Sequence, residues 1–393
     1  MSNDTQPEIR FPGFTDDWEL RKSKELCTIS TGKGNTQDKV DDGAYPFYVR
    51  SATIEKSDEY LYDQEAVLTV GDGVGTGKVY HYVNGKYNLH QRVYRMYDFK
   101  DVSAKYFYYY FSNNFYKRVM SMTAKTSVDS VRMEMIADMN IVFPSVKEQE
   151  NIVELFSNLD NTIALHQRKL DLLKETKKGF LQKMFPKNGA KVPEIRFPGF
   201  TEAWEERKLE TLFEKGGSGG TPKSTNPDYY RGDIPFLGIS DISNSNGYIK
   251  KTEKSITLEG LNNSAAWVVP KGAISLAMYA SVGKLAILNI DVATSQAFYN
   301  MVFNDDRLRD FVYQRLSMAN DLGEWIKLIS TGTQANLNAD KVKNFVIQLP
   351  SNIEEIGKIG SFLNQIDNTI ILHQRKLDLL KETKKGFLQK MFV

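Results

Sequence analysis

The chain has 393 residues, of which 41% are hydrophobic and 12% aromatic, so it can build the cores of two ordinary domains and is not globally disordered. Its 51 basic and 49 acidic residues leave a formal net charge of +2, a weak electrostatic signal for a protein that binds nucleic acid by itself. Cys27 is the single cysteine, which excludes an internal disulfide and a metal site built from cysteines.

The segment PEIRFPGFT lies at residues 7–15 and occurs again at residues 193–201, each time followed by a tryptophan, Trp18 or Trp204. This recurrence indicates an internal duplication. The N-terminal residues lack the apolar core of a secretory signal, and the sequence contains no apolar run long enough to span a bilayer. We therefore expect a soluble, cytoplasmic protein without a membrane segment.

Residues 14–143 are rich in short β-type runs that Gly, Asn and Asp interrupt, and their helical signal lies at residues 101–120. This pattern predicts a compact α+β domain with a strongly curved sheet. The aromatic stretch at residues 106–111 could form a platform on which bases stack, or it could be packed inside the domain. We favour packing, because the matching helix of the second half keeps only scattered apolar positions.

A long helix is predicted to follow each domain. Ser145 with Glu148, and Ser351 with Glu354, fit a capping box, in which each side chain satisfies the other residue's backbone amide. Apolar residues then recur at alternating steps of four and three, which is typical of a coiled-coil seam. The seam consists of Ile152, Phe156, Leu159, Ile163, His166, Leu170, Leu173, Lys177, Phe180 and Met184, and of Ile359, Leu363, Ile366, Ile370, His373, Leu377, Leu380, Lys384, Phe387 and Met391.

The last part of this helix is repeated without change. The sequence LHQRKLDLLKETKKGFLQKMF occupies residues 165–185 and residues 372–392. Two identical helices in one chain predict an intramolecular antiparallel coiled coil. A helix of about 40 residues is about 60 Å long at about 1.5 Å per residue, so we interpret the pair as a spacer.

Polar and glycine residues interrupt both helices at matching places. We expect Lys177 and Lys384 to fix the register of the seam, and we prefer this role also for the seam histidines over metal ligation. Gly179 and Gly386 are predicted to mark a close helix approach or a slight bend. The exposed basic residues of the repeat form either a solvated face or a surface that contacts DNA or partner subunits.

The second half follows the same order of elements. Strand-like runs lie at residues 232–241, 267–276, 284–289 and 296–303, and a helix is predicted at residues 307–319. Leu165 lies 158 residues after Pro7 and Leu372 lies 179 residues after Pro193, so the second half is 21 residues longer. The ends of the halves are nearly identical while the middles differ, apart from echoes such as Gln91 and Gln296. This contrast favours two recognition modules on a common frame, each tuned to a different ligand.

Three segments carry the hydroxyl, amide and basic groups that hydrogen-bond base edges and phosphates. They are residues 123–132, residues 330–338 and the glycine-rich loop at residues 216–225, and the alternative is that they are ordinary surface loops. The candidate DNA-binding residues are Arg92, Lys125, Thr126, Ser127, Thr221, Lys223, Tyr279, Ser281, Thr331, Thr333, Gln334 and Asn336.

The sequence proposes no catalytic residue, cofactor site or metal site. Residues 69–79, TVGDGVGTGKV, resemble a phosphate-binding loop, but Asp72 stands where the first glycine is needed and Val79 follows the lysine. The four histidines form no HExxH pair, and no carboxylates show metal-ligand spacing.

Several phrases closely resemble the specificity subunit of type I restriction-modification systems, and the resemblance covers essentially the whole chain. The phrases are GGTPKSTNPDYYRGDIPFL from Gly219, STGTQANLN from Ser330 with its final strand VIQLPS, FPSVKEQENIVELFSNLD from Phe143, and its echo LPSNIEEIGKIGSFLNQID from Leu349. In the second copy, Glu354-Glu355 replaces the Glu-Gln pair that follows the first Pro-Ser.

The resemblance implies an α+β fold, with two pseudo-two-fold-related target recognition domains separated by two long antiparallel coiled-coil helices. We assign the first domain to residues 1–144, the first helix to 145–186, a linker to 187–200, the second domain to 201–350 and the second helix to 351–393. Each domain would read one half of a bipartite DNA site, and the helices would set the unread spacer. Half-sites one turn apart lie about 34–36 Å from each other, which is within the reach of these helices.

The resemblance also implies partners that carry out the chemistry. Two methyltransferase subunits would dock on the helices and methylate a flipped adenine in each half-site with S-adenosylmethionine. Two restriction subunits would add ATP- and Mg-dependent translocation and cleavage, so this subunit would be non-catalytic and hold no cofactor. Partners that clamp DNA would also explain the near-neutral charge.

Three alternatives remain open at this point. The first is a stand-alone, sequence-specific DNA-binding regulator, which the near-neutral charge disfavours. The second is an enzyme with its own cofactor site, and the third is a coiled-coil scaffold with no role in DNA binding. We favour the specificity subunit and expect it in the bacterial cytoplasm.

Overall fold

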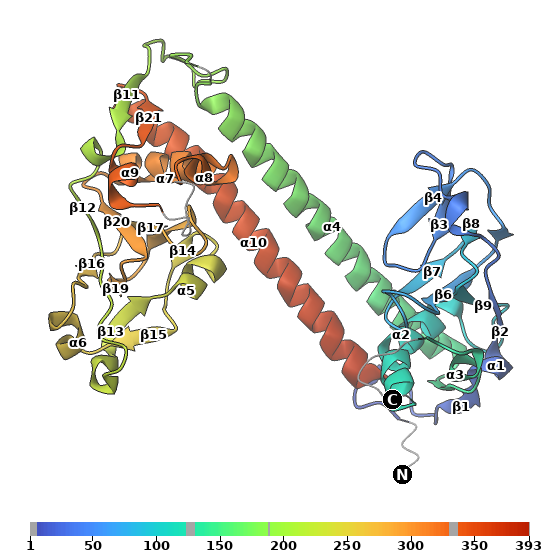
Figure 1. Cartoon of the computed structure of the whole chain (residues 1–393). Coiled ribbons are helices and arrows are strands. Elements are labelled where there is room, and N and C mark those ends of the chain that lie inside the picture. The colour runs from blue at the N-terminus through green and yellow to red at the C-terminus, as the bar shows by residue number, and fades with distance from the viewer. Residues whose placement is uncertain (1–5, 123–129, 188, 330–336, 393) are drawn as a thin grey trace. The chain divides into compact units, whose positions relative to one another are not determined.

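The computed structural model describes residues 6–122, 130–187, 189–329 and 337–392 (Figure 1). The chain divides into two compact units: unit 1 contains Met1–His166 and Lys376–Val393, and unit 2 is Gln167–Arg375. Each unit therefore combines one module of strands and short helices with parts of both long helices. Within the described ranges, no helix has the length and apolar character needed to cross a lipid bilayer.

The first module, residues 19–143, contains two four-stranded sheets with the orders β2-β9-β6-β7 and β4-β3-β8-β5. The strands are β2 Thr28–Thr31, β3 Tyr45–Tyr48, β4 Ile54–Ser57, β5 Tyr62–Asp63, β6 Ala66–Val70, β7 Tyr80–Val83, β8 Lys86–Leu89 and β9 Val93–Tyr97. The sequence predicted a single curved sheet. The structure has two sheets. The chain passes from one to the other at residues 90–92, which connect β8 to β9.

Helix α2, Ala104–Ser121, begins where the Ser103 hydroxyl accepts a hydrogen bond from the Tyr106 amide at 3.2 Å. It packs on β6 and β7. Its aromatic stretch is buried, with Tyr106, Phe107 and Phe111 wholly removed from solvent. The rings therefore build the core, which confirms that this helix is packed and is not a base-stacking platform.

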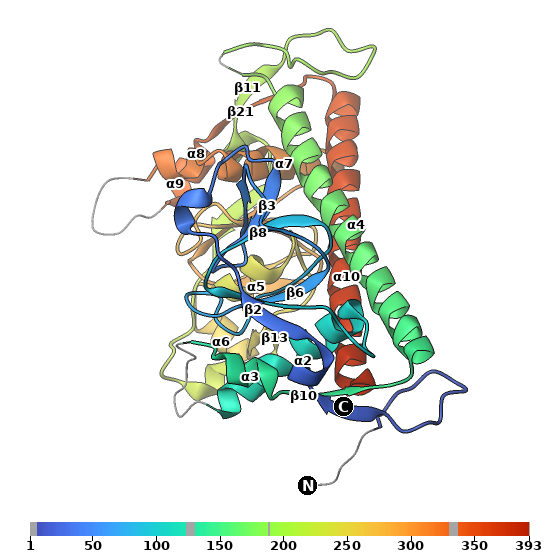
Figure 2. The ribbon, with the colours of Figure 1, turned by 90° about the vertical axis from the view of Figure 1, so that its right-hand side faces the viewer.

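A two-stranded ribbon leads from each module into a long helix. In unit 1, β1 (Glu19–Lys22) pairs antiparallel with β10 (Asn140–Phe143), and the short helices α1 (Ser23–Leu26) and α3 (Met133–Ala137) lie next to them in the chain. In unit 2, β11 (Glu205–Lys208) pairs in the same way with β21 (Val346–Leu349), as Figure 2 shows. These ribbons correspond to the repeated ends of the two halves.

The second module, residues 205–349, has the same plan with sheets β12-β20-β17-β18-β14 and β15-β13-β19-β16. Its strands are β12 Lys215–Ser218, β13 Tyr230–Leu237, β14 Tyr248–Ile249, β15 Lys254–Ile256, β16 Val268–Val269, β17 Ile274–Ala277, β18 Leu285–Leu288, β19 Val292–Thr294 and β20 Phe298–Val302. Its helices are α5 Ile239–Asn244, α6 Leu258–Asn262, α7 Asp306–Asp321, α8 Glu324–Lys327 and α9 Ala339–Lys343. The strand orders match those of the first module except for β14.

The extra strand explains much of the greater length of the second half. In the first module, residues 49–53 connect β3 to β4, whereas residues 238–253 connect the equivalent strands β13 and β15. The longer connection forms α5 and then β14, which pairs parallel with β18. We call residues 238–253 the insertion.

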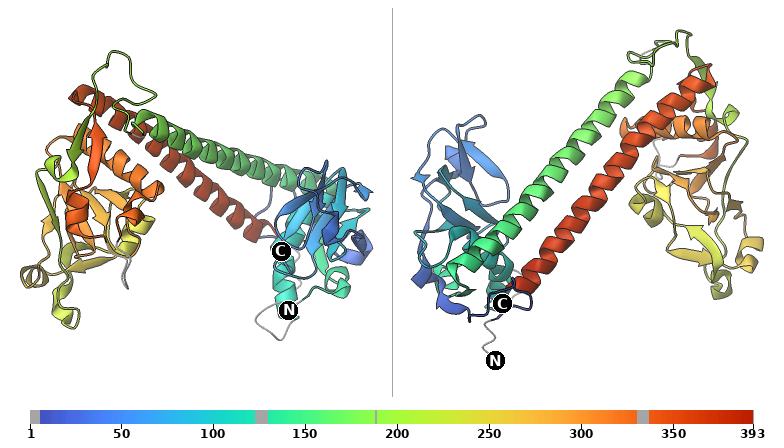
Figure 3. Two further views of the ribbon diagram at one scale, coloured as in Figure 1. Left: turned by 45° about the horizontal axis from the view of Figure 1, so that its top comes forward. Right: turned by 180° about the vertical axis from the view of Figure 1, so that it is seen from behind.

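The long helices α4 (Val146–Met184) and α10 (Ile353–Met391) have 39 residues each and run without interruption (Figure 3). In unit 1, the start of α4 packs on the end of α10, where the rings of Phe156 and Phe392 stack 5.6 Å apart. In unit 2, the end of α4 packs on the start of α10, where Phe180 meets Phe362 edge to face at 4.9 Å. In each unit the two segments run antiparallel, as the seam predicted.

The predicted capping boxes are wrong. Asn352 caps α10, because its side chain accepts a hydrogen bond from the Glu354 amide at 2.8 Å. The Glu148 carboxylate accepts two hydrogen bonds from Arg10. In the second copy, the Glu355 carboxylate accepts the equivalent two hydrogen bonds from Arg196. The second copy therefore carries one additional residue before its helix. The apparent replacement of Glu-Gln by Glu354-Glu355 was an error of alignment.

The helix glycines do not mark a close approach of the helices. A Cβ atom built on Gly179 or Gly386 meets no atom of another element within 4 Å. Both positions instead weaken otherwise regular helices, since glycine is a poor helix former.

Candidate nucleic-acid interface

The repeated PEIRFPGF segments build the frame of each unit through a buried ion pair. Arg10 donates from Nε and Nη2 to Glu148 at 2.7 and 2.8 Å, and Arg196 does the same to Glu355 at 2.6 and 2.8 Å. Both glutamates are buried, and hydrogen bonding to them raises the pKa of each arginine. The repeated PEIRFPGF segment therefore has a structural role. We look for base recognition in the loops that differ between the two halves.

A second duplicated feature joins each module to both long helices. In unit 1, Asp160 of α4 pairs with Lys384 of α10 and accepts a hydrogen bond from the Tyr109 hydroxyl of α2 at 2.9 Å. In unit 2, Asp367 of α10 pairs with Lys177 of α4 at 2.7 Å and accepts from Gln314 of α7 at 2.7 Å. The seam lysines thus link the register of the two helices to the position at which each module packs on them.

In the first module, the loop after β2 meets the turn before β9. The amide of Gln91 donates to Asn35 Oδ1 at 2.9 Å, and both side chains are exposed. The predicted residue Arg92 is next in the turn, with Nε 3.8 Å from Asp72, whose other carboxylate oxygen lies 3.8 Å from Arg50. Exposed amides beside arginines are the groups that read base edges and hold phosphates.

The hairpin loop between β6 and β7 borders this surface. It is the segment that resembles a phosphate loop, and Val74 at its tip is 96% exposed. A cavity of about 340 Å³ lies beside it, lined by residues that include Thr36, Arg50 and His90. Burial, with a smaller contribution from Arg50, lowers the pKa of His90. The neutral imidazole accepts the Arg92 amide at 3.1 Å and so shapes the turn.

The second module has the equivalent pair of side chains. The Thr221 hydroxyl donates to Gln296 Oε1 at 2.7 Å, joining the loop after β12 to the turn before β20. Lys223 is exposed in the same loop. The structure therefore brings a glutamine and a polar loop residue together in both modules, although the loop residue differs: Asn35 in one and Thr221 in the other.

The glycine-rich loop at residues 216–225 is shorter than predicted, because Lys215–Ser218 form β12. Gly219 and Gly220 serve packing: a Cβ atom on Gly219 would collide with the Thr294 carbonyl, and one on Gly220 would lie 2.7 Å from Ala265. Only the part from Thr221 onward is available for contact with a ligand.

Tyr279 and Ser281 lie in the turn between β17 and β18, and Ser281 adopts a left-handed φ of 58°. The Met278 carbonyl of this turn accepts the Leu337 amide at 3.2 Å, just as Gly71 accepts the Val131 amide at 2.7 Å in the first module. In both modules, this hydrogen bond joins the hairpin to the chain just after a segment that lies outside the described residues.

Seven predicted site residues lie outside the described residues: Lys125, Thr126, Ser127, Thr331, Thr333, Gln334 and Asn336. The other five, Arg92, Thr221, Lys223, Tyr279 and Ser281, lie in loops or turns of the modules. The prediction omitted Asn35, Arg50, Gln91 and Gln296. The match between Gln91 and Gln296 in sequence was the available signal, but their partners come from distant loops that no spacing reveals.

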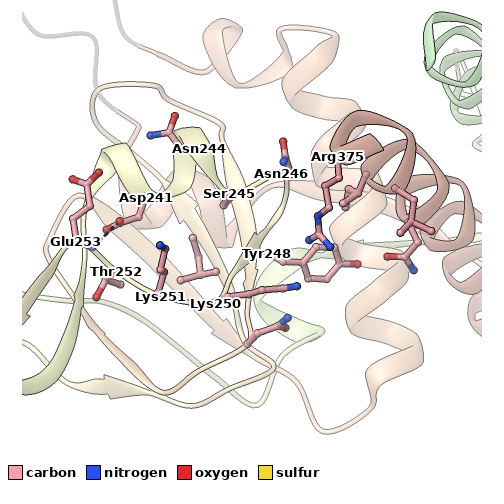
Figure 4. Close-up of a pocket in the computed structure, with 15 residues that line it drawn as sticks. Asp241, Asn244, Ser245, Asn246, Tyr248, Lys250, Lys251, Thr252, Glu253 and Arg375 are labelled. Carbon is pink, nitrogen blue, oxygen red and sulfur yellow. Dashed lines mark hydrogen bonds between the residues drawn. The ribbon is translucent and has the colours of Figure 1, made fainter. Parts of the chain in front are cut away.

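A groove of about 790 Å³ lies in unit 2 between the insertion and α10 (Figure 4). Lys250 and Lys251 line it from the insertion, and Arg375 reaches into it from α10 toward the ring of Tyr248. The sequence prediction did not include Lys250 and Lys251, whereas Arg375 is one of the basic residues of the helix repeat for which DNA contact was one of two interpretations.

The described residues contain no group of three or more His, Cys, Asp and Glu side chains that could hold a metal ion. The arrangement instead offers polar, partly basic loop surfaces carried on a duplicated frame.

Comparison with known proteins gives a family. The model of the type I restriction modification DNA specificity domain matches residues 15–175 and 201–382. The chain is 29% identical over 192 residues to the MjaIX specificity subunit of Methanocaldococcus jannaschii, covering 48% of this chain and 44% of that protein. It is 23% identical over 401 residues to the MjaVIII specificity subunit of the same organism, covering 95% and 91%. The matches to the MjaIX subunit and to the EcoDI subunit of Escherichia coli span less than half of those relatives.

The fold is also similar to a solved structure. The S subunit of a type I restriction-modification system from M. genitalium superposes with a TM-score of 0.73 at 14% identity, over 99% of both chains. This likeness supports the α+β fold with repeated modules and long helices. Because the family model matches one domain in each half and most of the chain, the chain belongs to the type I restriction-modification DNA specificity family.

Proposed function

We propose that this chain is the non-catalytic subunit that gives a type I restriction-modification complex its DNA sequence specificity. Each module reads one half of a bipartite site, and the helix pair sets the spacer between the halves. The observation that carries this proposal is the pairing of an invariant frame with variable loops. Arg10–Glu148 and Arg196–Glu355 are equivalent, whereas the loop partners of Gln91 and Gln296 differ.

The glutamine turns are our candidates for base contact. A glutamine amide can hydrogen-bond adenine through two of its atoms, and a bidentate contact of this kind discriminates by about 1–3 kcal/mol against the wrong base. Gln91 forms one hydrogen bond with Asn35, and Gln296 forms one with Thr221. Each bond orients the glutamine amide before DNA binds. Arg92, Lys223, Tyr279, Ser281 and the seven residues outside the described ranges remain predicted contacts.

The helices offer a docking surface for methyltransferase subunits. Leu165 and Leu172 lie seven residues apart, and therefore on one face of α4, and both are more than half exposed. Leu372 and Leu379 repeat this pair on α10. Large apolar side chains left in water indicate a protein partner, and two equivalent pairs support two copies of that partner.

The chemistry belongs to the partners in this proposal. Two methyltransferase subunits would use S-adenosylmethionine to methylate a flipped adenine in each half-site, and two restriction subunits would use ATP and Mg. This chain would position the methyltransferases and support restriction, in the cytoplasm of a bacterium. A stand-alone DNA-binding regulator is the alternative, and the net charge of +2 argues against it.

The proposal is tested by mapping methylated adenines in cells that express the neighbouring methyltransferase gene with and without this chain. We expect methylation at a two-part motif with a fixed gap only when the chain is present. A catalytically inactive methyltransferase serves as the control. Methylation that is identical with and without the chain would refute the specificity role and favour a regulator or scaffold.

A further inference from the structure

The insertion builds a surface that the first module lacks. The sheet β2-β9-β6-β7 ends at β7 in the first module, whereas β14 extends the equivalent sheet beyond β18 in the second. The connection that contains β14 is residues 238–253, against residues 49–53 in the first module. The groove between this insertion and α10 is therefore specific to the second module.

The basic residues of the groove carry free positive charge. The ends of the Lys250, Lys251 and Arg375 side chains make no hydrogen bond or ion pair with any other residue that the structure describes. The two acidic residues of the lining are already engaged. Asp241 accepts the amides of Gly238 and Glu253 at 2.8 and 3.0 Å, and the Glu253 carboxylate lies 3.0 Å from the Ser240 hydroxyl.

Neutral donors complete the lining. Asn244 and Asn246 belong to the insertion, Asn289 follows β18, and Asn368 lies on α10. Amide donors together with lysine and arginine are the groups that contact the sugar-phosphate backbone. They carry no preference for a base sequence when they bind phosphates.

The wall of the groove is held in place from behind. Gly247 has a φ of 86°, and a Cβ atom there would collide with the Tyr313 hydroxyl of α7. The ring of Tyr248 lies 6.4 Å from that of Tyr313. Because close packing anchors the turn at residues 245–248, the groove is a built feature and not the surface of a loose loop.

We propose that this groove binds the phosphate backbone of duplex DNA next to the half-site that the second module reads. The ligand class follows from three unpaired cations and four amide side chains on two facing walls, which outnumber the two carboxylates, Asp241 and Glu253, that hydrogen-bond within the insertion. An acidic protein segment is the rival occupant, but Ile249 is already buried, and the apolar side chains left to cover, Ile371 and Leu372, lie on the α10 wall, where Leu372 belongs to the surface proposed for the methyltransferase. This inference rests on the proposed function. It adds a contact that increases the affinity for DNA but does not change the base sequence that is recognised.

The test uses the full chain in complex with its methyltransferase subunit. The variant is Lys250→Gln/Lys251→Gln/Arg375→Gln, and its binding to duplexes with and without the methylated motif is measured by fluorescence anisotropy from 50 to 200 mM KCl. Each lost phosphate contact lowers the slope of log K against log salt by about 0.9, so we expect the slope to fall by about 2–3. Affinity at 50 mM KCl should fall at least tenfold for both duplexes, and the methylated motif should not change.

Lys271→Gln is the control, because Lys271 is an exposed lysine of the second module that does not line the groove. The proposal is overturned if the triple variant keeps the wild-type slope, if only motif-bearing DNA is affected, or if Lys271→Gln has the same effect. Failure of the triple variant to co-purify with the methyltransferase would identify a protein partner and also overturn it. If the wild-type complex recognises no motif, the proposed function fails. The salt dependence of binding to the duplex without the motif still tests the groove.

Discussion

The buried Arg196–Glu355 pair shows how strongly one residue can affect a unit. The Glu355 side chain is fully buried, the Arg196 side chain is 13% exposed, and two hydrogen bonds join them. Arg196→Met leaves Glu355 charged and unpaired, so we expect unit 2 to lose about 3–5 kcal/mol. Arg196→Met/Glu355→Met should recover most of that loss, as measured by urea unfolding. A double variant as unstable as the single one would contradict this account.

Histidine titration makes the stability of unit 1 depend on pH. Burial lowers the pKa of His81, and burial with the charge of Arg50 lowers that of His90. The unfolded chain, with a histidine pKa of about 6.5, then binds more protons than the folded chain. Stability is therefore complete above about pH 6.5 and decreases as the pH falls toward the lower folded pKa values.

The melting temperature measured between pH 8 and 5.5 checks this expectation. His81→Phe keeps a ring against Tyr48, which His81 meets at 4.9 Å, and removes one titrating group. The variant should lose less stability on acidification than the wild type. An unchanged pH profile would show that His81 does not contribute.

At the scale of secondary structure, the seam of the long helices and the start of α4 directly after Ser145 were predictable from the sequence, but the start of α10 was not. A single additional residue before α10 moves the cap to Asn352 and the buried carboxylate to Glu355. The seam positions differ by 207 residues between the copies and already align Glu148 with Glu355, whereas the Pro-Ser phrases are offset by 206. The contact of Glu355 with Arg196, which lies 159 residues away in the sequence, shows that the seam gives the correct alignment.

The helix glycines give a prediction at the same scale. Gly179→Ala and Gly386→Ala introduce a Cβ atom into open space, so each should stabilise the protein by up to about 1 kcal/mol. The change is measured by denaturant unfolding, with Glu175→Ala, an exposed position of the same repeat, as the control that stays within about 0.5 kcal/mol. A destabilised glycine variant would show that these positions lie against a neighbour after all.

At the scale of the whole molecule, the duplication predicted the two modules and the two helices. It did not predict that each module has two sheets, because the chain crosses between them at residues 90–92 without a composition signal. The candidate surface was predicted only in part. Gln91 and Gln296 were visible as a repeated position, but Asn35 and Thr221 become their partners only through the fold.

The central claim is that each module reads its own half-site. It is tested by replacing residues 201–350 with the same region of a related specificity subunit and mapping methylated adenines for both proteins. We predict that one half of the motif changes, while the other half keeps its sequence and its methylation. Two changed halves, or an unchanged motif, would contradict the division of recognition between the modules.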